Sequence, residues 1–423
     1  MLISRLNAIP RFALPYSAGD FIAASLALVR GTPPPDAFTM LGDSPKFWTR
    51  SGRQALRLLL TALDLPRGSG VALPLFTDPS LVSAILAAGH RPVFIDVDEQ
   101  TLTMDPKSLD AAAGRFKTVV IVHLFGQTAD VPALVAAAGN VPVIEDTAHA
   151  PLSFLNGRLA GTFGLASFYS FASTKYWPAG GGGLAIAHDA KVAHRMADLT
   201  ATLGRCSHLT VVRHLLMQAA KSAVFGRALY GTLGMALRRQ VEKWALLEPQ
   251  LDLNAIESTH AAAAVRQAPR FAERVEKQRA NSLRLLSQIG GAEGVVLPTE
   301  RFGARYNYHL FPVLLRDSSE RAAVMAAMWD RFVDTSTIYS GAIAECRKFG
   351  YRGGCPVAES VAERLLTLPN YASLTDGEID AVAWVFLSSL DACRKAKPRT
   401  PVLNFDITPA RVRGIPTPVV NRS

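Results

Sequence analysis

Short apolar runs alternate with longer helical stretches between about residues 50 and 190. The apolar runs predict strands at 69–76, 91–98, 117–126, 141–150, 166–171 and 182–188. The stretches between them predict helices at 54–63, 81–88, 105–116 and 130–139. Because strands that alternate with helices of this length form parallel sheets covered on both faces, the pattern favours an α/β fold with a mostly parallel sheet.

The pattern changes in the second half of the chain. It is helical from about residue 190 to about 290, extended at 305–316, and helical again at 319–332 and from about residue 375. These changes predict a chain of four parts. They are an N-terminal arm or helix at 1–44, a large domain at 45–264, a smaller α+β domain at 265–395 and an extended tail at 396–423, which is rich in proline and arginine.

The composition is that of a globular protein of about two or three domains. Of the 423 residues, 49% are hydrophobic and 19% are charged, which excludes a disordered chain and a coiled coil. The formal net charge is +10, which favours anionic partners: phosphates, carboxylates, nucleic acid or an acidic membrane surface. Nucleic acid is the least favoured, because the basic residues are spread out and no helix-turn-helix or aromatic-rich sheet signature appears.

The four cysteines, Cys206, Cys346, Cys355 and Cys393, are scattered and include no C-x-x-C pair. This argues against a disulfide framework and a structural zinc site, so no metal centre is expected. The first residues lack the apolar core of a signal peptide. No uncharged apolar run approaches the roughly 18 residues that a spanning helix needs. We therefore expect a cytoplasmic protein.

Residues able to do chemistry stand where predicted strands end or a predicted helix begins. Asp146 ends one apolar strand and His149 follows it, while Ser170 and Lys175 follow the next strand, ahead of four consecutive glycines. The Ser-Gly pair at 51–52 precedes a helix, whose N-terminus would offer N–H groups to a phosphate. The carboxyl ends of strands in open α/β sheets are where ligands bind. A phosphate site, a lysine nucleophile and a carboxylate in one cleft are what pyridoxal phosphate requires.

Each of these residues has a simpler explanation when taken singly. A lysine in a turn is usually a solvated charge, Asp146 could cap the following helix, and His149 could be a buried structural histidine. Ser51 could be an N-cap and nothing more, and the glycine run could be an ordinary tight turn. Their joint presence in this order favours the cofactor site, because one common cofactor requires all of them.

Four segments carry a family resemblance: 89–109, 117–134, 141–150 and 156–175. With their ED-x-A-H and S-F-x-x-x-K motifs, they resemble the DegT/StrS family of sugar aminotransferases, which belongs to the fold type I pyridoxal-phosphate superfamily. The resemblance extends from about residue 45 to 200 and resumes at 253–254, 306–315 and 368–369. It implies a large domain with a seven-stranded, mostly parallel sheet and a smaller C-terminal α+β domain.

The resemblance also implies roles for particular residues. Lys175 matches the Schiff-base lysine, which favours transamination, because family members that dehydrate their substrates carry histidine there. Asp146 matches the partner of the pyridine nitrogen, and His149 matches the residue beside the ring and its phenolic oxygen. The cofactor phosphate would be bound by Ser170, by the turn at Gly52, Arg53 and Gln54, and by Asn254 from the other subunit. The resemblance therefore implies a homodimer.

The sequence departs from the family pattern at three places. Arg53 replaces a threonine of the phosphate turn, and its guanidinium could take over the phosphate contact. Asp78 stands where the family has an aromatic residue stacked on the cofactor ring, so Phe76 could supply that contact instead. The glycine run 180–183 lacks the family's glutamate, which changes the charge of the substrate pocket.

The chain between Gly204 and Asn254 is longer than family members usually have, and it is expected to be helical, with Asn254 in the middle of the helical stretch. The extra segment at about 205–245 is amphipathic and basic. It could rest on a membrane surface near a lipid-linked substrate or partner. The favoured interpretation is a helix pair packed on the dimer or over the active site, because apolar stripes at helical spacing are usually buried.

The leading functional prediction is an aminotransferase that uses pyridoxal phosphate. It would transfer an amino group from an amino acid, glutamate by family analogy, to a keto-sugar nucleotide in surface polysaccharide or amino-sugar biosynthesis. One alternative is a pyridoxal-phosphate enzyme of another reaction type, a lyase or a dehydratase. The other is a non-catalytic relative that binds a partner or a membrane through residues 205–245.

Overall fold

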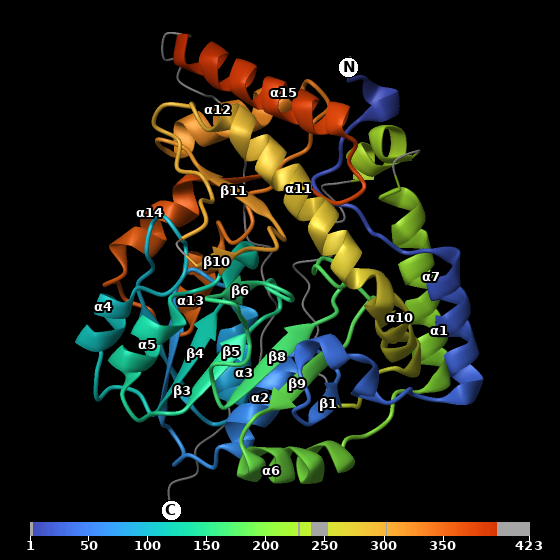
Figure 1. Cartoon of the computed structure of the whole chain (residues 1–423), viewed down its shortest axis with the longest axis vertical. Coiled ribbons are helices and arrows are strands. Elements are labelled where there is room, and N and C mark those ends of the chain that lie inside the picture. The colour runs from blue at the N-terminus through green and yellow to red at the C-terminus, as the bar shows by residue number, and fades with distance from the viewer. Residues whose placement is uncertain (1–2, 227–228, 238–252, 302, 396–423) are drawn as a thin grey trace, which may run out of the picture.

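The computed structural model describes residues 3–226, 229–237, 253–301 and 303–395, so the expected tail and part of the segment 205–245 lie outside the described residues. A seven-stranded sheet with the order β1-β9-β8-β5-β4-β2-β3 forms its centre (Figure 1). The strands are β1 Lys46–Thr49, β2 Gly70–Pro74, β3 Arg91–Ile95, β4 Thr118–Val122, β5 Val143–Asp146, β8 Ala166–Ser170 and β9 Gly183–Ala187. Strands β3, β2, β4, β5 and β8 are parallel, while β9 and β1 are antiparallel to their neighbours. The expected α/β fold with a mostly parallel sheet is confirmed.

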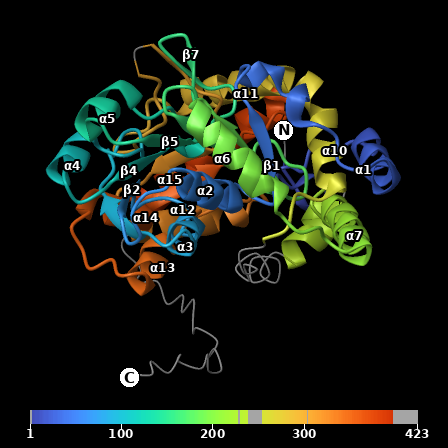
Figure 2. The same ribbon diagram turned by 90° about the horizontal axis from the view of Figure 1, so that it is seen from below.

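Helices cover both faces of this sheet, as Figure 2 shows from below. One face packs against α2 Gly52–Ala62, α3 Ser80–Ala87 and α6 Ala190–Ala201, and the other against α4 Pro106–Ala111 and α5 Val131–Ala138. Aspartates fix where several helices begin, since Asp105, Asp130 and Asp189 accept backbone N–H groups of α4, α5 and α6. All residues of β2, β4 and β9 are buried, as expected for strands covered on both faces.

A second hydrophobic core lies apart from the sheet and is built by the C-terminal part of the chain. It contains α11 Phe271–Ile289, the antiparallel pair of β11 Phe311–Leu314 and β12 Leu365–Leu368, α12 Ser318–Trp329 and α15 Asp376–Lys395. Helices α13 Ala342–Lys348 and α14 Pro356–Arg364 pack instead on the core beneath the large sheet. The C-terminal part therefore mixes helices with a small sheet and is joined to the large sheet by α13 and α14.

Several elements escape the sequence pattern because they are short. They are β1, β12 and a three-stranded sheet of β6 Phe154–Leu155, β7 Arg158–Leu159 and β10 Ala304–Arg305. The strand expected at 305–316 is divided between β10 and β11. Between them Tyr308 has a φ of 51°, in the left-handed region that a regular strand cannot contain.

The helical stretch expected from 190 to 290 is also interrupted. After α6, the chain forms α7 His208–Val224, a π-helical turn at Tyr230–Gly234 and, after the undescribed residues, α10 Ser258–Gln267. Asn254 is extended and forms an isolated bridge with Gly204, and the Ala255 N–H donates to the Gly204 carbonyl over 2.7 Å. The prediction that Asn254 lies within a helix is therefore wrong, because its backbone pairs with a segment distant in sequence.

The N-terminal helix α1 Ala18–Arg30 packs along α10, and α7 lies beside it at the right edge in Figure 1. Thus two segments outside the alternation of strands and helices form one edge of the molecule. Within the described part of the chain, every helix is too short or too polar to cross a membrane.

Candidate active site

The candidate site forms where β5 and β8 end and the chain turns over the edge of the sheet. Asp146 is the last residue of β5, and its side chain is buried. Its carboxylate accepts a hydrogen bond of 2.9 Å from the Ala148 N–H. Burial raises the pKa of Asp146 to about 6, against the opposing effect of the Lys175 charge. A buried carboxylate with so few donors is suited to pair with a cation.

Lys175 lies on the turn that follows β8. The turn is held by two backbone hydrogen bonds, from the Lys175 N–H to the Ala172 carbonyl and from the Ala179 N–H to the Phe171 carbonyl. The Lys175 side chain is 14% exposed, and its Nζ lies 2.9 Å from His149 Nε2 and 3.8 Å from a carboxylate oxygen of Asp78. The structure therefore brings together the lysine, the histidine and the acidic residues expected at the site.

The hydrogen bonds of His149 indicate which ring nitrogen carries the proton. The Phe125 N–H donates to His149 Nδ1 over 3.3 Å, so Nδ1 is an acceptor and Nε2 carries the hydrogen of the neutral ring. Burial and the neighbouring Lys175 and His309 hold the pKa of His149 well below its usual value. The ring is therefore neutral, and its Nε2 lies 2.9 Å from Lys175 Nζ and 3.3 Å from the Tyr339 hydroxyl.

Aromatic rings form a wall around this group. Phe125 and Tyr339 stack with an interplanar angle of 23°, and Phe76 contacts both rings edge-on. Phe125 and Tyr339 have φ angles of 59° and 63°, and the nearby Tyr308 is also left-handed. Such conformations cost energy in residues other than glycine and tend to gather at functional sites. Phe76 thus lies in the wall, and its contact with the cofactor ring stays a prediction.

The expected phosphate turn lies at the N-terminus of α2. Ser51 is the N-cap, and its hydroxyl accepts the Gln54 N–H over 3.2 Å. A methyl group at Gly52 would lie 3.1 Å from Cβ of Ser170, so the turn packs closely on the end of β8. This brings Gly52 and Ser170 together as expected, with Arg53 half-buried in the first turn of the helix.

Gln54 and Asn254 form the other side of this turn. The Gln54 side chain is fully buried, where its carbonyl oxygen accepts the Arg50 N–H over 2.6 Å. Its amide nitrogen donates to the Asn254 carbonyl over 3.0 Å. Gln54 therefore supports the turn and joins it to Asn254, so it shapes the expected binding site from beneath.

Sequence reasoning missed two residues of the site, His309 and Tyr339. The His309 ring lies 4.6 Å from the His149 ring, and the backbone N–H of His309 donates to the side-chain oxygen of Asn307. Burial lowers the pKa of His309 to about 3. His309 lies in one of the segments of family resemblance, and this could have marked it as a site residue. Nothing in the sequence around Tyr339 distinguishes that residue.

The residues present fit pyridoxal phosphate. A buried carboxylate, a nearly buried lysine and a neutral histidine meet at one end of the sheet. The segment 170–175 connects this group to the Ser170 hydroxyl, which lies beside Gly52 at the N-terminus of α2. Gly52 has no side chain that would fill the turn. This donor set is the one from which the cofactor site was predicted.

Comparison with known proteins gives the family. Residues 41–386 match the model of the DegT/DnrJ/EryC1/StrS aminotransferase family.

The chain belongs to this family and is an aminotransferase.

Its curated relatives include a UDP-N-acetyl-3-dehydro-alpha-D-glucosamine 3-aminotransferase of Acidithiobacillus ferrooxidans, 28% identical over 80% of this chain and 83% of the relative. A dTDP-4-dehydro-2,3,6-trideoxy-D-glucose 4-aminotransferase of Saccharopolyspora spinosa is 29% identical over 83% of this chain and 86% of the relative. Among solved structures, the aminotransferase TlmJ from Streptoalloteichus hindustanus aligns with a TM-score of 0.74 at 25% identity, covering 91% of this chain and all of that one. The family assignment and the fold therefore agree.

Proposed function

We propose that this DegT/DnrJ/EryC1/StrS aminotransferase uses pyridoxal phosphate to transfer an amino group from an amino acid, with glutamate as the expected donor, to a keto-sugar carried by a nucleotide. The observation that carries the proposal is the meeting of Lys175, His149 and Asp146 at the carboxyl end of β5. The curated relatives named above, which act on UDP- and dTDP-linked sugars, support the substrate class.

Each residue would have a distinct task. When bound, pyridoxal phosphate supplies a ring that accepts electrons from the substrate carbon. Asp146 would hold a proton on the ring nitrogen, His149 Nε2 would donate to the phenolic oxygen, and Lys175 would attach the cofactor and move a proton at the substrate carbon. Phosphate oxygens would be bound by the Ser170 hydroxyl, the N–H groups at Gly52 and the Arg53 guanidinium. The aromatic wall excludes water from this proton transfer.

The experiment is to load purified protein with pyridoxal phosphate, reduce it with borohydride and locate the label by mass spectrometry. We expect a label on Lys175 of the wild type and of the surface control Lys191→Ala, and none on Lys175→Ala. In a separate sample that is not reduced, glutamate and a nucleotide keto-sugar supplied together should yield 2-oxoglutarate and the amino-sugar nucleotide in equal amounts. A label without amino transfer would favour a lyase or dehydratase, and the absence of any label would favour a non-catalytic relative.

The homodimer is part of the same proposal, with Asn254 binding the phosphate in the partner's site. Light scattering measures the oligomeric state, and mixing tests the shared site. Lys175→Ala and Asn254→Ala are both impaired, but a mixed dimer of the two variants contains one site with both wild-type residues. Activity should rise on mixing, and mixtures no more active than their components would contradict the shared site.

The cytoplasmic location also stays a prediction.

Contact of residues 205–245 with a membrane surface is a second, separate candidate function. The outer surface of α7 exposes 80% of Leu209 and 67% of Leu216, and the helix contains arginine and lysine but no acidic residue. Co-sedimentation with vesicles rich in anionic lipid, lost in Leu209→Glu, would support it. Equal recovery in the supernatant with and without vesicles would exclude it.

A further inference from the structure

Helix α7 reaches the loop that carries Lys175, although the two are distant in sequence. The contact is made by Gln218, whose side-chain oxygen accepts the Ser173 hydroxyl over 2.9 Å. Gln218 is 7% exposed and, with Val211, is one of the two buried residues of this mostly exposed helix. Ser173 lies two residues before Lys175, so the bond fixes the loop close to the lysine.

The same amide also contacts the chain on the other side of Lys175. A methyl group at Gly180 would lie 3.3 Å from the amide carbon of Gln218 and 3.2 Å from the His260 ring. Gly180 has a φ of 91°, so both the contact and the conformation favour glycine. Gln218 thus contacts the segment 173–180 at both ends, and Lys175 lies between the two contacts.

A buried ionic cluster holds α7 in the position from which Gln218 contacts the Lys175 loop. His214, one turn before Gln218, lies 2.6 Å from the buried Glu257 carboxylate at the start of α10. Glu257 also pairs with Arg50 over 2.7 Å, and Arg50 directly precedes the phosphate turn. The cluster therefore joins α7 to both the turn at 51–52 and the glycine run that follows Lys175, where His260 packs on Gly181.

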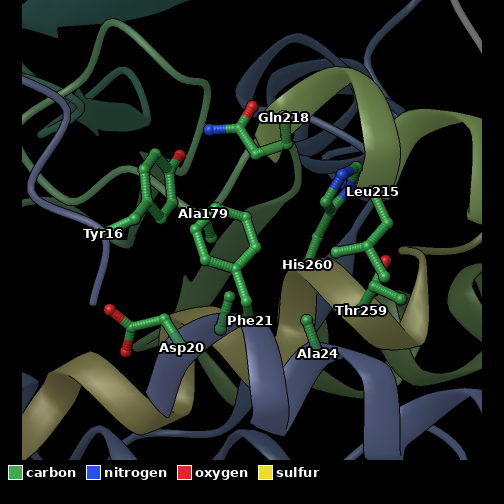
Figure 3. A pocket seen from close by; sticks show the side chains of 10 residues that line it. Tyr16, Asp20, Phe21, Ala24, Ala179, Leu215, Gln218, Thr259 and His260 are labelled. Carbon is green, nitrogen blue, oxygen red and sulfur yellow. The ribbon is translucent and has the colours of Figure 1, made fainter. Parts of the chain in front are cut away.

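The N-terminal arm packs against Gln218 and His260 through Tyr16. Tyr16, Gln218 and His260 line a small cavity with Ala179 between them, as Figure 3 shows. Burial raises the pKa of the Tyr16 hydroxyl, which lies beside Ser173 and Gly180. The amide of Gln218 is thus enclosed with the loop and is inaccessible to a partner that binds the outer surface of α7.

We propose that Gln218 is a positioning residue, which holds the segment 171–183 so that Lys175 points to the cofactor. The proposal rests on the proposed function, in which Lys175 binds pyridoxal phosphate. It gives the long segment after Gly204 a role in the active site, through one face of α7. The exposed leucines of that helix lie on its other face and take no part in it.

The test compares Gln218→Ala, Ser173→Ala and the double variant with Met217→Ala, a neighbour that is 41% exposed on the outer surface of α7. Hydrogen exchange of peptides covering 171–183 is measured without cofactor. Each single variant should speed exchange about fivefold, as expected for the loss of one buried hydrogen bond, and the double variant should add little. Met217→Ala should leave exchange unchanged. The dissociation constant of pyridoxal phosphate, followed by tryptophan fluorescence, should rise by a similar factor.

Unchanged exchange at 171–183 in Gln218→Ala, or equal effects of that substitution with and without Ser173, would overturn the proposal. If Gln218→Ala does not fold, Ser173→Ala alone decides, because it removes only a hydroxyl and carries the same expectation. Because exchange is measured on the cofactor-free protein, a failure of Lys175 to bind pyridoxal phosphate would refute the proposed function and leave this result standing.

Discussion

Two consecutive residues at the end of β5, Glu145 and Asp146, are both buried carboxylates and point to opposite faces of the sheet. Glu145 accepts four hydrogen bonds of 2.6–2.9 Å, one from the His123 ring and three from backbone N–H groups in the segment 161–164. Among the described residues, Asp146 accepts one, from Ala148. The two carboxylates therefore have similar burial and very different numbers of donors.

The donors decide what each carboxylate can do. Burial acts to raise the pKa of Glu145, but the hydrogen bonds and charge of His123 and the backbone N–H groups outweigh it, so the pKa is lowered. Burial raises the pKa of Asp146 to about 6, because too few donors oppose it. Glu145 is thus a satisfied charge that ties the segment 161–164 to the sheet. Asp146 has too few hydrogen-bond donors to offset its burial, so it can pair with a cation, which is the property that a cofactor site needs.

The largest effect should come from Asp146→Asn. The variant keeps the shape of the side chain and removes the charge that would hold a proton on the cofactor ring, so kcat/KM for transamination should fall about 10²–10³-fold. Without cofactor, its unfolding midpoint at neutral pH should lie above that of the wild type, since a buried and poorly satisfied charge has been removed. Activity within tenfold of the wild type would show that Asp146 does not serve the cofactor.

Glu145→Gln should have the opposite outcome. An amide at this position turns one acceptor into a donor against the N–H groups of 161–164 and leaves His123 without its partner, which should cost about 3 kcal/mol of unfolding free energy. The folded fraction should keep most of its kcat. Denaturant unfolding and steady-state kinetics on the same samples separate the two effects. Full stability in this variant would contradict the structural role of Glu145.

The pH dependence of stability distinguishes the two residues a second way. The folded-state pKa of Asp146 is raised from 3.8 to about 6, so the folded protein binds the extra proton between these values. This stabilisation is complete below pH 3.8 and is lost as the pH rises through 6, by about 3 kcal/mol. The lowered pKa of Glu145 has the opposite effect on stability: its stabilisation is complete above the ordinary pKa of 4.5 and is lost as the pH falls below that value. The free energy of unfolding of the cofactor-free wild type should therefore approach that of Asp146→Asn at pH 4 and be lower than that of the variant at pH 6.5. A difference between the two proteins that does not change with pH would refute this.

The sequence predicted the sheet, its flanking helices and most of the residues at the site. It could do so because Asp146 and Ser170 end apolar strands and Lys175 lies in the turn that follows, where position in the chain determines position in space. The letters E and D at 145 and 146 gave no sign that the two residues differ, because the donors to Glu145 come from a later turn.

Contacts between distant segments account for what the sequence did not predict. Tyr339 enters the site from the C-terminal part through a left-handed backbone that no periodicity reports. Asn254 was placed in a helix because apolar periodicity surrounds it, whereas its backbone pairs with Gly204. The cluster of Glu257, Arg50 and His214 joins three separate segments, so no local motif marks it.

A third acidic residue, Asp78, sharpens the comparison and should give the smallest effect. It is half-exposed, accepts the Ser80 N–H over 3.0 Å and lies 3.8 Å from Lys175 Nζ, so it is neither satisfied like Glu145 nor buried like Asp146. In Asp78→Phe an aromatic ring returns to the position that the family resemblance assigns to ring stacking. Stacking is worth about 1 kcal/mol, so pyridoxal phosphate should bind about fivefold tighter, as measured by equilibrium dialysis. The matched variant Asp78→Leu adds apolar bulk without a ring and should gain less. If both variants bind equally tightly, the gain would come from removing the charge beside Lys175, and the ring contact would then be supplied by Phe76 and its neighbours in the aromatic wall.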